Sequence, residues 1–330
     1  MATTETVQPR SYVGFDSIPA QIEKKLLKRG FQLNIMCVGQ TGLGKSTLIN
    51  TIFASHLLES KGRMAPTEPI RQTTEIQNVS HVIVENNVRL HLNIIDTPGY
   101  GDKVNNERCW DPIVKYIKDQ HSNYLRKELT PNREKYIPDT RVHCVLFFIQ
   151  PTGHSLKPID LIVLKKLMEL CNVVPVIAKS DALTVEEQAG FKNRIKQEFA
   201  THHLKMFPFD SELLDEDERA MNAHIRNMIP FAVVGSEKDI VVDGGKIVRG
   251  RKSRWGLINV ENENHCEFIS LRNFLTRTHL HELVDTTSQV HYETFRSRQL
   301  IALKDPNNDR SRPISPAPPS HGSDYHLNRH

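Results

Sequence analysis

Residues 39 to 46 read Gly-Gln-Thr-Gly-Leu-Gly-Lys-Ser and match the pattern G-x-x-x-x-G-K-[ST] of a phosphate-binding loop, or P-loop. An apolar run of strand length, residues 31–38, precedes this stretch, and apolar residues at helical spacing follow it from Leu48 to Phe53. A loop between a strand and a helix directs several backbone N–H groups and the positive end of the helix dipole at one anion. The alternative is a glycine-rich turn that binds nothing. Because the motif and its flanks agree, we expect a phosphate site.

Each residue type in this loop has a chemical reason to be there. Gly39 and Gly44 let the backbone close around phosphate oxygens without a clashing Cβ. Lys45 can reach the β and γ phosphates and assist catalysis, and the Ser46 hydroxyl can coordinate Mg²⁺. The residues expected to contact the nucleotide are Gly39, Gln40, Thr41, Gly42, Leu43, Gly44, Lys45, Ser46 and Thr47.

A second loop, Asp96-Thr97-Pro98-Gly99, ends a predicted hairpin formed by residues 75–84 and 88–96. Placed after a P-loop, the Asp96 carboxylate can hold Mg²⁺ through a water molecule, and the Gly99 N–H can sense the γ phosphate. The alternative is a simple strand-terminating turn. Tyr100 follows Gly99, where many GTPases carry a glutamine that orients water, so we expect slow hydrolysis.

Thr73 precedes the hairpin at the position of a switch threonine. In that role it would bind Mg²⁺ and position the attacking water. The alternative is a β-forming residue at the start of a strand.

Lys179-Ser180-Asp181 follows another buried strand, residues 173–178, and bears on the choice of base. Guanine presents N1–H and an exocyclic amine that one carboxylate accepts together, whereas adenine has no such pair and would leave Asp181 unpaired. The Lys179 stem can cover the face of the ring. The pattern favours GTP, and a P-loop ATPase is the alternative.

Strands alternate with helices, and the chemistry lies at strand ends. This arrangement predicts an α/β fold, a doubly wound sheet of the Ras-like P-loop NTPase type with its ligand at the carboxyl edge. We divide the chain into an N-terminal segment with a basic helix (1–30), a nucleotide-binding domain (31–236), an additional element (237–300) and a disordered tail (301–330).

Composition limits the partners. Lys and Arg exceed Asp and Glu by only four, 43 against 39, so no overall charge demands nucleic acid. Five dispersed cysteines without a C-x-x-C pair indicate a reducing compartment, and no signal peptide or apolar run of membrane-spanning length is evident. We expect a cytosolic protein.

A basic cluster, comprising Lys24, Lys25, Lys28 and Arg29, is either a site for anionic phosphoinositide lipid or an ordinary solvated helix end.

The combined motifs resemble those of the septins, GTP-binding proteins that polymerise into filaments. The resemblance spans about residues 12–300. It is carried by the P-loop, by DTPGYGD at 96–102, by AKSD at 178–181 and by RGRKSRWGLINVENENHCEF at 249–268. SYVGFDSI, KRGFQLNIM and the short tail without heptads are similar to a fungal cell-division septin that lacks a C-terminal coiled coil. Ser180 stands where the family commonly has Ala, and Arg254 replaces a frequent Pro.

The resemblance implies further roles. The element at 237–300 would be the septin-unique element, with Arg251 packed on guanine and Gly235 touching the base. Trp255 would lie in the subunit interface on the nucleotide side, and His154 of PTGHSLKP would reach the neighbour's nucleotide. The cluster from Lys24 to Arg29 would match the family's phosphoinositide-binding stretch.

These observations lead us to expect a slow GTPase. It would assemble with other septin subunits into hetero-oligomeric filaments at a membrane or division site. A monomeric GTPase switch that acts through effector binding is the alternative. The extension after Gly235 argues against it, because a minimal switch does not need one.

Overall fold

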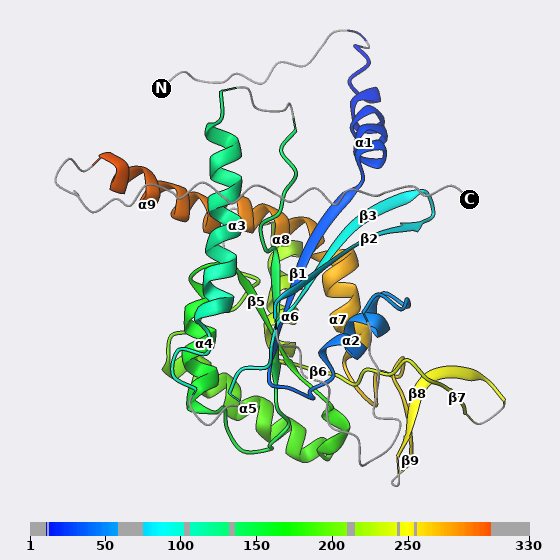
Figure 1. Cartoon of the computed structure of the whole chain (residues 1–330). Coiled ribbons are helices and arrows are strands. Elements are labelled where there is room, and N and C mark those ends of the chain that lie inside the picture. Colours follow the sequence, from blue (N-terminus) through cyan, green and yellow to red (C-terminus); the bar gives the residue numbers. More distant parts are fainter. Residues whose placement is uncertain are drawn as a thin grey trace, which may run out of the picture.

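The computed structural model describes residue 11 and residues 13–58, 75–101, 106–131, 136–209, 215–242, 245–253 and 256–304. Its centre is a six-stranded sheet in the order β2-β3-β1-β4-β5-β6 (Figure 1). The strands are β1 Phe31–Gly39, β2 Gln77–Glu85, β3 Val88–Asp96, β4 Cys144–Ile149, β5 Asn172–Ile177 and β6 Phe231–Ala232. All neighbours pair in parallel except β2, which runs antiparallel to β3. The expected α/β doubly wound fold is confirmed.

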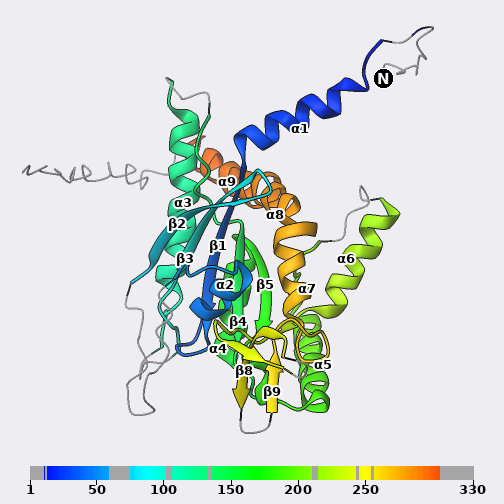
Figure 2. The same cartoon turned by 90° about the vertical axis from the view of Figure 1, so that its right-hand side faces the viewer.

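Helices cover both faces of this sheet because its strands are apolar on both sides. In β4, Leu146 and Phe148 face one core, whereas Val145 and Phe147 face the other. The first core packs against α2 Lys45–Ile52, α6 Glu216–Met228, α7 Phe268–Asn273 and α8 Leu280–Thr286. The second packs against α3 Asp111–Leu129, α4 Pro158–Met168 and α5 Val185–Thr201. Figure 2 shows α7 and α8 on one side of the strands and α3 on the other.

The strand order places the site. β1 lies between β3 and β4, so the chain crosses to opposite sides of β1 and leaves a crevice at the carboxyl ends of these strands. Strand register brings the ends together: Cys37 of β1 lies beside Asp96 of β3, and Gly39 lies beside Phe148 of β4. The loops after β1, β3, β4 and β5 therefore meet at one edge.

A smaller antiparallel sheet follows β6 and contains β7 Asp239–Val241, β8 Ile247–Ser253 and β9 Gly256–Asn259. The β7–β8 pair is antiparallel, with Asp239 beside Arg249 and Val241 beside Ile247. Beyond it, α7 and α8 are each followed by a π-helical segment, at Phe274–Thr278 and Thr287–Tyr292, and α9 spans Glu293–Lys304. Residues 301–304 are thus helical rather than part of the expected disordered tail, and the rest of that tail lies outside the described residues.

The basic helix α1, Ser17–Arg29, is confirmed, but its apolar side chains are not buried by the described part of the chain. Ile22 and Leu26 are 54% and 40% exposed, and α1 has no buried residue. The helix projects from the amino end of β1, at the opposite end of the sheet from α2 (Figures 1 and 2). Within the described part of the chain, no helix is both long and apolar enough to cross a membrane.

Candidate functional site

The P-loop connects β1 to α2 as the motif predicts. Gly39 packs so closely on β4 that a Cβ there would lie 2.7 Å from the Cβ of Phe148. Gly44 adopts a left-handed conformation with φ of 85° before α2 begins at Lys45. The Lys45 ammonium is nearly buried and donates to the carbonyls of Gly39 and Gln40 at 3.1 and 3.2 Å. A cation thus lies at the loop, where a bound triphosphate would need one.

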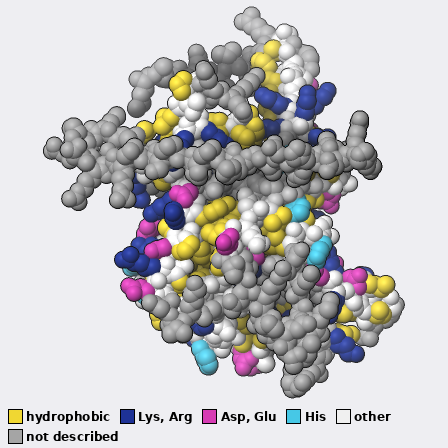
Figure 3. Space-filling view, in the orientation of Figure 1, with side chains coloured by type: hydrophobic (Ala, Val, Ile, Leu, Met, Phe, Trp, Pro, Cys, Tyr) yellow, Lys and Arg dark blue, Asp and Glu magenta, His cyan; other side chains and the backbone are white. Residues whose placement is uncertain are grey.

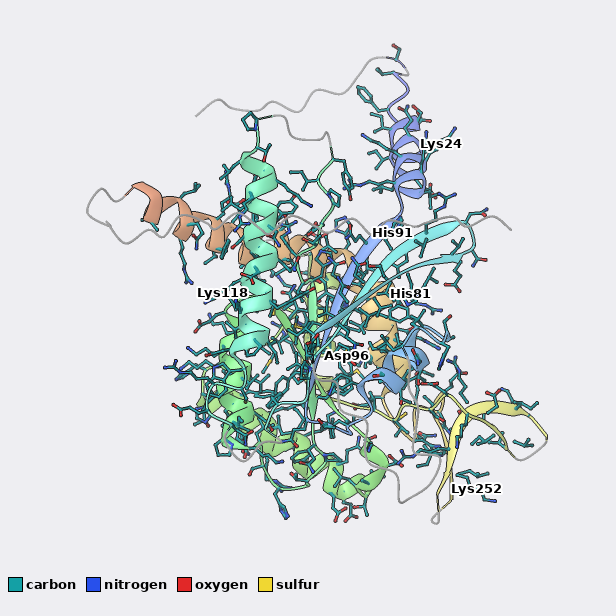
Figure 4. All side chains as sticks on the ribbon, viewed as in Figure 1. Lys24, His81, His91, Asp96, Lys118 and Lys252 are labelled. Atoms are coloured by element: carbon teal, nitrogen blue, oxygen red, sulfur yellow. The ribbon has the colours of Figure 1, made fainter. Side chains whose placement is uncertain are left out.

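Asp96 lies at the carboxyl end of β3, immediately beside β1 (Figure 4). The charges of Asp96 and Lys45 both act on the pKa of the neighbouring Cys37 thiol. Its pKa is raised, first by burial and then by the Asp96 carboxylate, while Lys45 acts in the opposite direction. Thr97 fixes the start of the loop, because its hydroxyl donates to the Cys37 carbonyl at 2.7 Å. The Ser46 hydroxyl and the Asp96 carboxylate are hard oxygen donors near Lys45, a set that suits Mg²⁺.

The loop that follows β5 lies against the P-loop. Lys179 adopts a left-handed conformation at the end of β5, and its Nζ donates to the Gly42 carbonyl at 2.6 Å. The Ser180 N–H donates to the Val233 carbonyl at 3.1 Å, which fixes the turn beside the end of β6. Three loops that are distant in sequence, those of Lys45, Asp96 and Asp181, therefore meet at one sheet edge.

Asp181 has the geometry of a base acceptor. Its side chain is 6% exposed, and Oδ2 accepts from the Arg251 guanidinium on β8. Oδ1 is buried and has no hydrogen-bond partner among the residues that the structure describes. A buried acceptor without a partner is costly, and the paired N–H donors of guanine would satisfy it. The residues present therefore fit a guanine ring.

The other expected site residues have mixed placements. Gly235 packs against α2, since a Cβ there would lie 3.1 Å from the Cα of Leu48. His154 is exposed, and its carbonyl accepts from Arg194 Nε at 2.6 Å. Thr73 and Trp255 lie outside the described residues.

Two contacts at this edge were not expected from the sequence. Lys157 Nζ donates to Oε1 of Gln40 at 3.1 Å, which joins the loop before α4 to the P-loop. Lys157 belongs to the PTGHSLKP stretch, so its neighbourhood was already marked by a motif. The Tyr100 hydroxyl donates to Asp160 Oδ1 at 2.7 Å, and nothing in the sequence spacing points to that pair.

A P-loop and the loops of Asp96 and Asp181, which meet at one edge of a doubly wound sheet, are the arrangement of a P-loop GTPase. Comparison with protein families narrows the class, because the septin family model matches residues 29–309. The chain belongs to the septin family.

Relatives and solved structures agree with this assignment. The chain is 60% identical to Septin homolog spn2 of Schizosaccharomyces pombe over 318 residues, covering 96% of each protein. It is 56% identical to Cell division control protein 10 of Saccharomyces cerevisiae, covering 94% of this chain and 97% of that protein. The septin GTPase domain from Chlamydomonas reinhardtii has a TM-score of 0.58 at 25% identity, covering 81% of this chain and 98% of that structure.

Proposed function

We propose that this septin binds GTP with Mg²⁺, hydrolyses it slowly and uses the bound nucleotide to shape its contacts with other septin subunits. The buried Oδ1 of Asp181, placed beside the P-loop, carries the proposal, because it supplies an acceptor that guanine satisfies and adenine does not. In this reading Lys45 binds the β and γ phosphates, Ser46 and Asp96 hold the metal, and Thr73 positions water. Arg251 and Gly235 would border the base.

Slow turnover follows from what stands after Gly99. Tyr100 is 2% exposed and directed into the protein, so its side chain does not orient a water at the γ phosphate. Among the described residues of the loop after β3, none has contacts that would let it orient this water instead. Chemistry would then depend on Mg²⁺, Lys45, the backbone N–H groups and the water that Thr73 positions.

Assembly is supported by the family and by the additional sheet. We propose that the chain joins other septins in hetero-oligomeric filaments that act in cell division, as the name of its relative Cell division control protein 10 suggests. The β7–β8–β9 sheet follows β6 and contacts the base-reading carboxylate through Arg251, so nucleotide and extension are coupled. His154 and Trp255 would contribute to the interface on this side. A monomeric switch would not need this sheet.

We also propose that α1 brings the protein to anionic membrane at the division site or bud neck, from a cytoplasmic, cytoskeletal location. Basic side chains gather on this projecting helix (Figure 3). Lys24, Lys25, Lys28 and Arg29 are all exposed, but the Arg29 guanidinium also lies 4.3 Å from the centroid of the Tyr136 ring. The three lysines would therefore contribute more to binding phosphoinositides than Arg29.

Nucleotide content tests the core of this proposal. Chromatography of the nucleotide released when the purified protein is denatured should yield GDP or GTP, and the Lys45→Ala variant should release none. Adenine nucleotide would overturn the assignment of the base.

Electron microscopy at low salt with partner septins should show rods or filaments, and their absence would favour the monomeric switch.

A further inference from the structure

Tyr100 is held in the protein interior directly after the residue expected to sense the γ phosphate. Its ring packs on Phe147 of β4 with centroids 5.9 Å apart, and its hydroxyl donates to Oδ1 of Asp160 at 2.7 Å. The side chain is 2% exposed. The backbone at Gly99 is thus followed by an anchor in the core.

Asp160 is a fixed partner for this hydroxyl. It is the third residue of α4 and only 4% exposed. Burial raises the pKa of its carboxyl, while hydrogen bonds from the Tyr100 hydroxyl and the Lys157 backbone N–H oppose that shift. The same carboxyl group therefore joins the first turn of α4 to the loop after β3.

The segment is confined from its other side by the P-loop. Gly101 adopts φ of 80°, and a Cβ there would lie 3.5 Å from Nε2 of Gln40. Oε1 of the same Gln40 accepts from Lys157, which directly precedes α4. Gly99 to Gly101 are therefore placed between the P-loop and the start of α4.

We propose that Tyr100 and Asp160 are positioning residues that hold the Gly99 N–H toward the γ phosphate and so set the preference for a nucleoside triphosphate over a diphosphate. This inference rests on the proposed guanine-nucleotide site. The hydroxyl touches no part of the expected ligand and acts through the backbone of the preceding residue. Losing it should affect only contacts to the third phosphate, because Lys45 and Asp181 do not depend on this pair.

The test compares dissociation constants for GTPγS and GDP, measured by calorimetry with Mg²⁺ present. Tyr100→Phe keeps the ring on Phe147 and removes only the hydroxyl. We expect the ratio of the GDP constant to the GTPγS constant to fall about five- to ten-fold, the size of one ordinary intramolecular hydrogen bond, with GDP affinity unchanged. Asp160→Ala should lower the ratio equally. The double variant should be no lower than either single variant, because both remove one interaction.

Tyr292→Phe is a matched control. Tyr292 is 3% exposed, and its hydroxyl donates to Glu128 on α3, so the substitution removes the same kind of bond elsewhere. It should lower stability without changing the ratio. An unchanged ratio in Tyr100→Phe, or an equal fall in Tyr292→Phe, would overturn the inference while leaving guanine binding intact. Failure of the unaltered protein to bind either nucleotide would overturn the proposed function as well.

Discussion

Lys179 Nζ and the carbonyl oxygen of Gly42 lie 2.6 Å apart, which ties the base-reading loop to the P-loop across 137 residues of sequence. The contact holds the Lys179 side chain against the P-loop, two residues before Asp181. In the proposed function, this lysine would also cover the face of the base. The aliphatic stem offers an apolar surface to a base, while the ammonium closes the site.

Lys179→Ala should therefore weaken guanine-nucleotide binding about ten-fold, mainly through faster dissociation, because both the clamp and the cover of the ring are lost. Stability without nucleotide should change by less than about 1 kcal/mol, since the hydrogen bond is exposed. Stopped-flow release of a fluorescent GDP measures the rate. Lys166→Ala, an exposed lysine of α4, is the control. Equal release rates in the two variants would contradict the clamp.

Two P-loop glycines should respond differently to alanine. Gly39→Ala would place a Cβ 2.7 Å from that of Phe148, so β1 and β4 must separate, at a cost of about 3 kcal/mol. Gly44→Ala meets no atom within 4 Å and costs only the left-handed conformation, about 1 kcal/mol. Urea unfolding of both variants measures the difference. If Gly44→Ala lowered the free energy of unfolding more than Gly39→Ala, close packing against Phe148 would not be the reason for a glycine at position 39.

Sequence patterns predicted the elements that carry the site with good accuracy. β1, the hairpin of β2 and β3, and β5 lie close to where the apolar patterns put them, because local residue types determine each one. Contacts between residues that are far apart in the sequence could not be predicted from it. The Tyr100–Asp160 bond and the Arg251–Asp181 pair depend on how loops meet in space.

Local patterns also failed where tertiary context decides. Ile162 lies on α4 among buried apolar residues but is itself 45% exposed, and β6 is only two residues long. The helix α6 was not predicted, since its polar sequence has few apolar positions. The π-helical segments after α7 and α8 interrupt the α-helix, although the helical spacing of apolar residues continues through them.

Buried histidines should make stability fall in mild acid. Burial lowers the pKa of His121, His279 and His291 to about 4, below the ordinary value near 6.5 that applies when the chain is unfolded. Between these values the unfolded chain binds more protons, so stability falls as the pH drops from about 6.5 toward 4, by up to about 1.4 kcal/mol per pH unit for each histidine.

Urea unfolding at pH 7 and pH 5 measures this slope. His279→Gln should reduce the difference between the two pH values by roughly one histidine's share. His202→Gln, which alters an exposed histidine, should leave it unchanged. An equal slope in the His279 variant and the unaltered protein would assign the acid sensitivity to other groups.

The lysines of α1 should control membrane binding. Each basic residue near an anionic surface contributes about 1 kcal/mol, so replacing Lys24, Lys25 and Lys28 with glutamine should weaken binding to phosphoinositide vesicles by about 100-fold. Arg29→Gln should have a smaller effect, because its side chain lies on Tyr136. Co-sedimentation measures both, with the exposed α4 lysines Lys165 and Lys166 changed to glutamine as the control. If the control and the α1 variants lost equal vesicle binding, the effect would come from net charge and not from the position of the α1 lysines.

The most direct test of the account is an exchange of base specificity at Asp181. Asparagine at this position offers an amide donor where xanthine presents a carbonyl, and it removes the acceptor that guanine needs. Calorimetry of Asp181→Asn should show that GTP affinity falls at least about ten-fold while XTP affinity rises by a similar factor. Unchanged GTP affinity in this variant would contradict the claim that Asp181 reads guanine beside the P-loop.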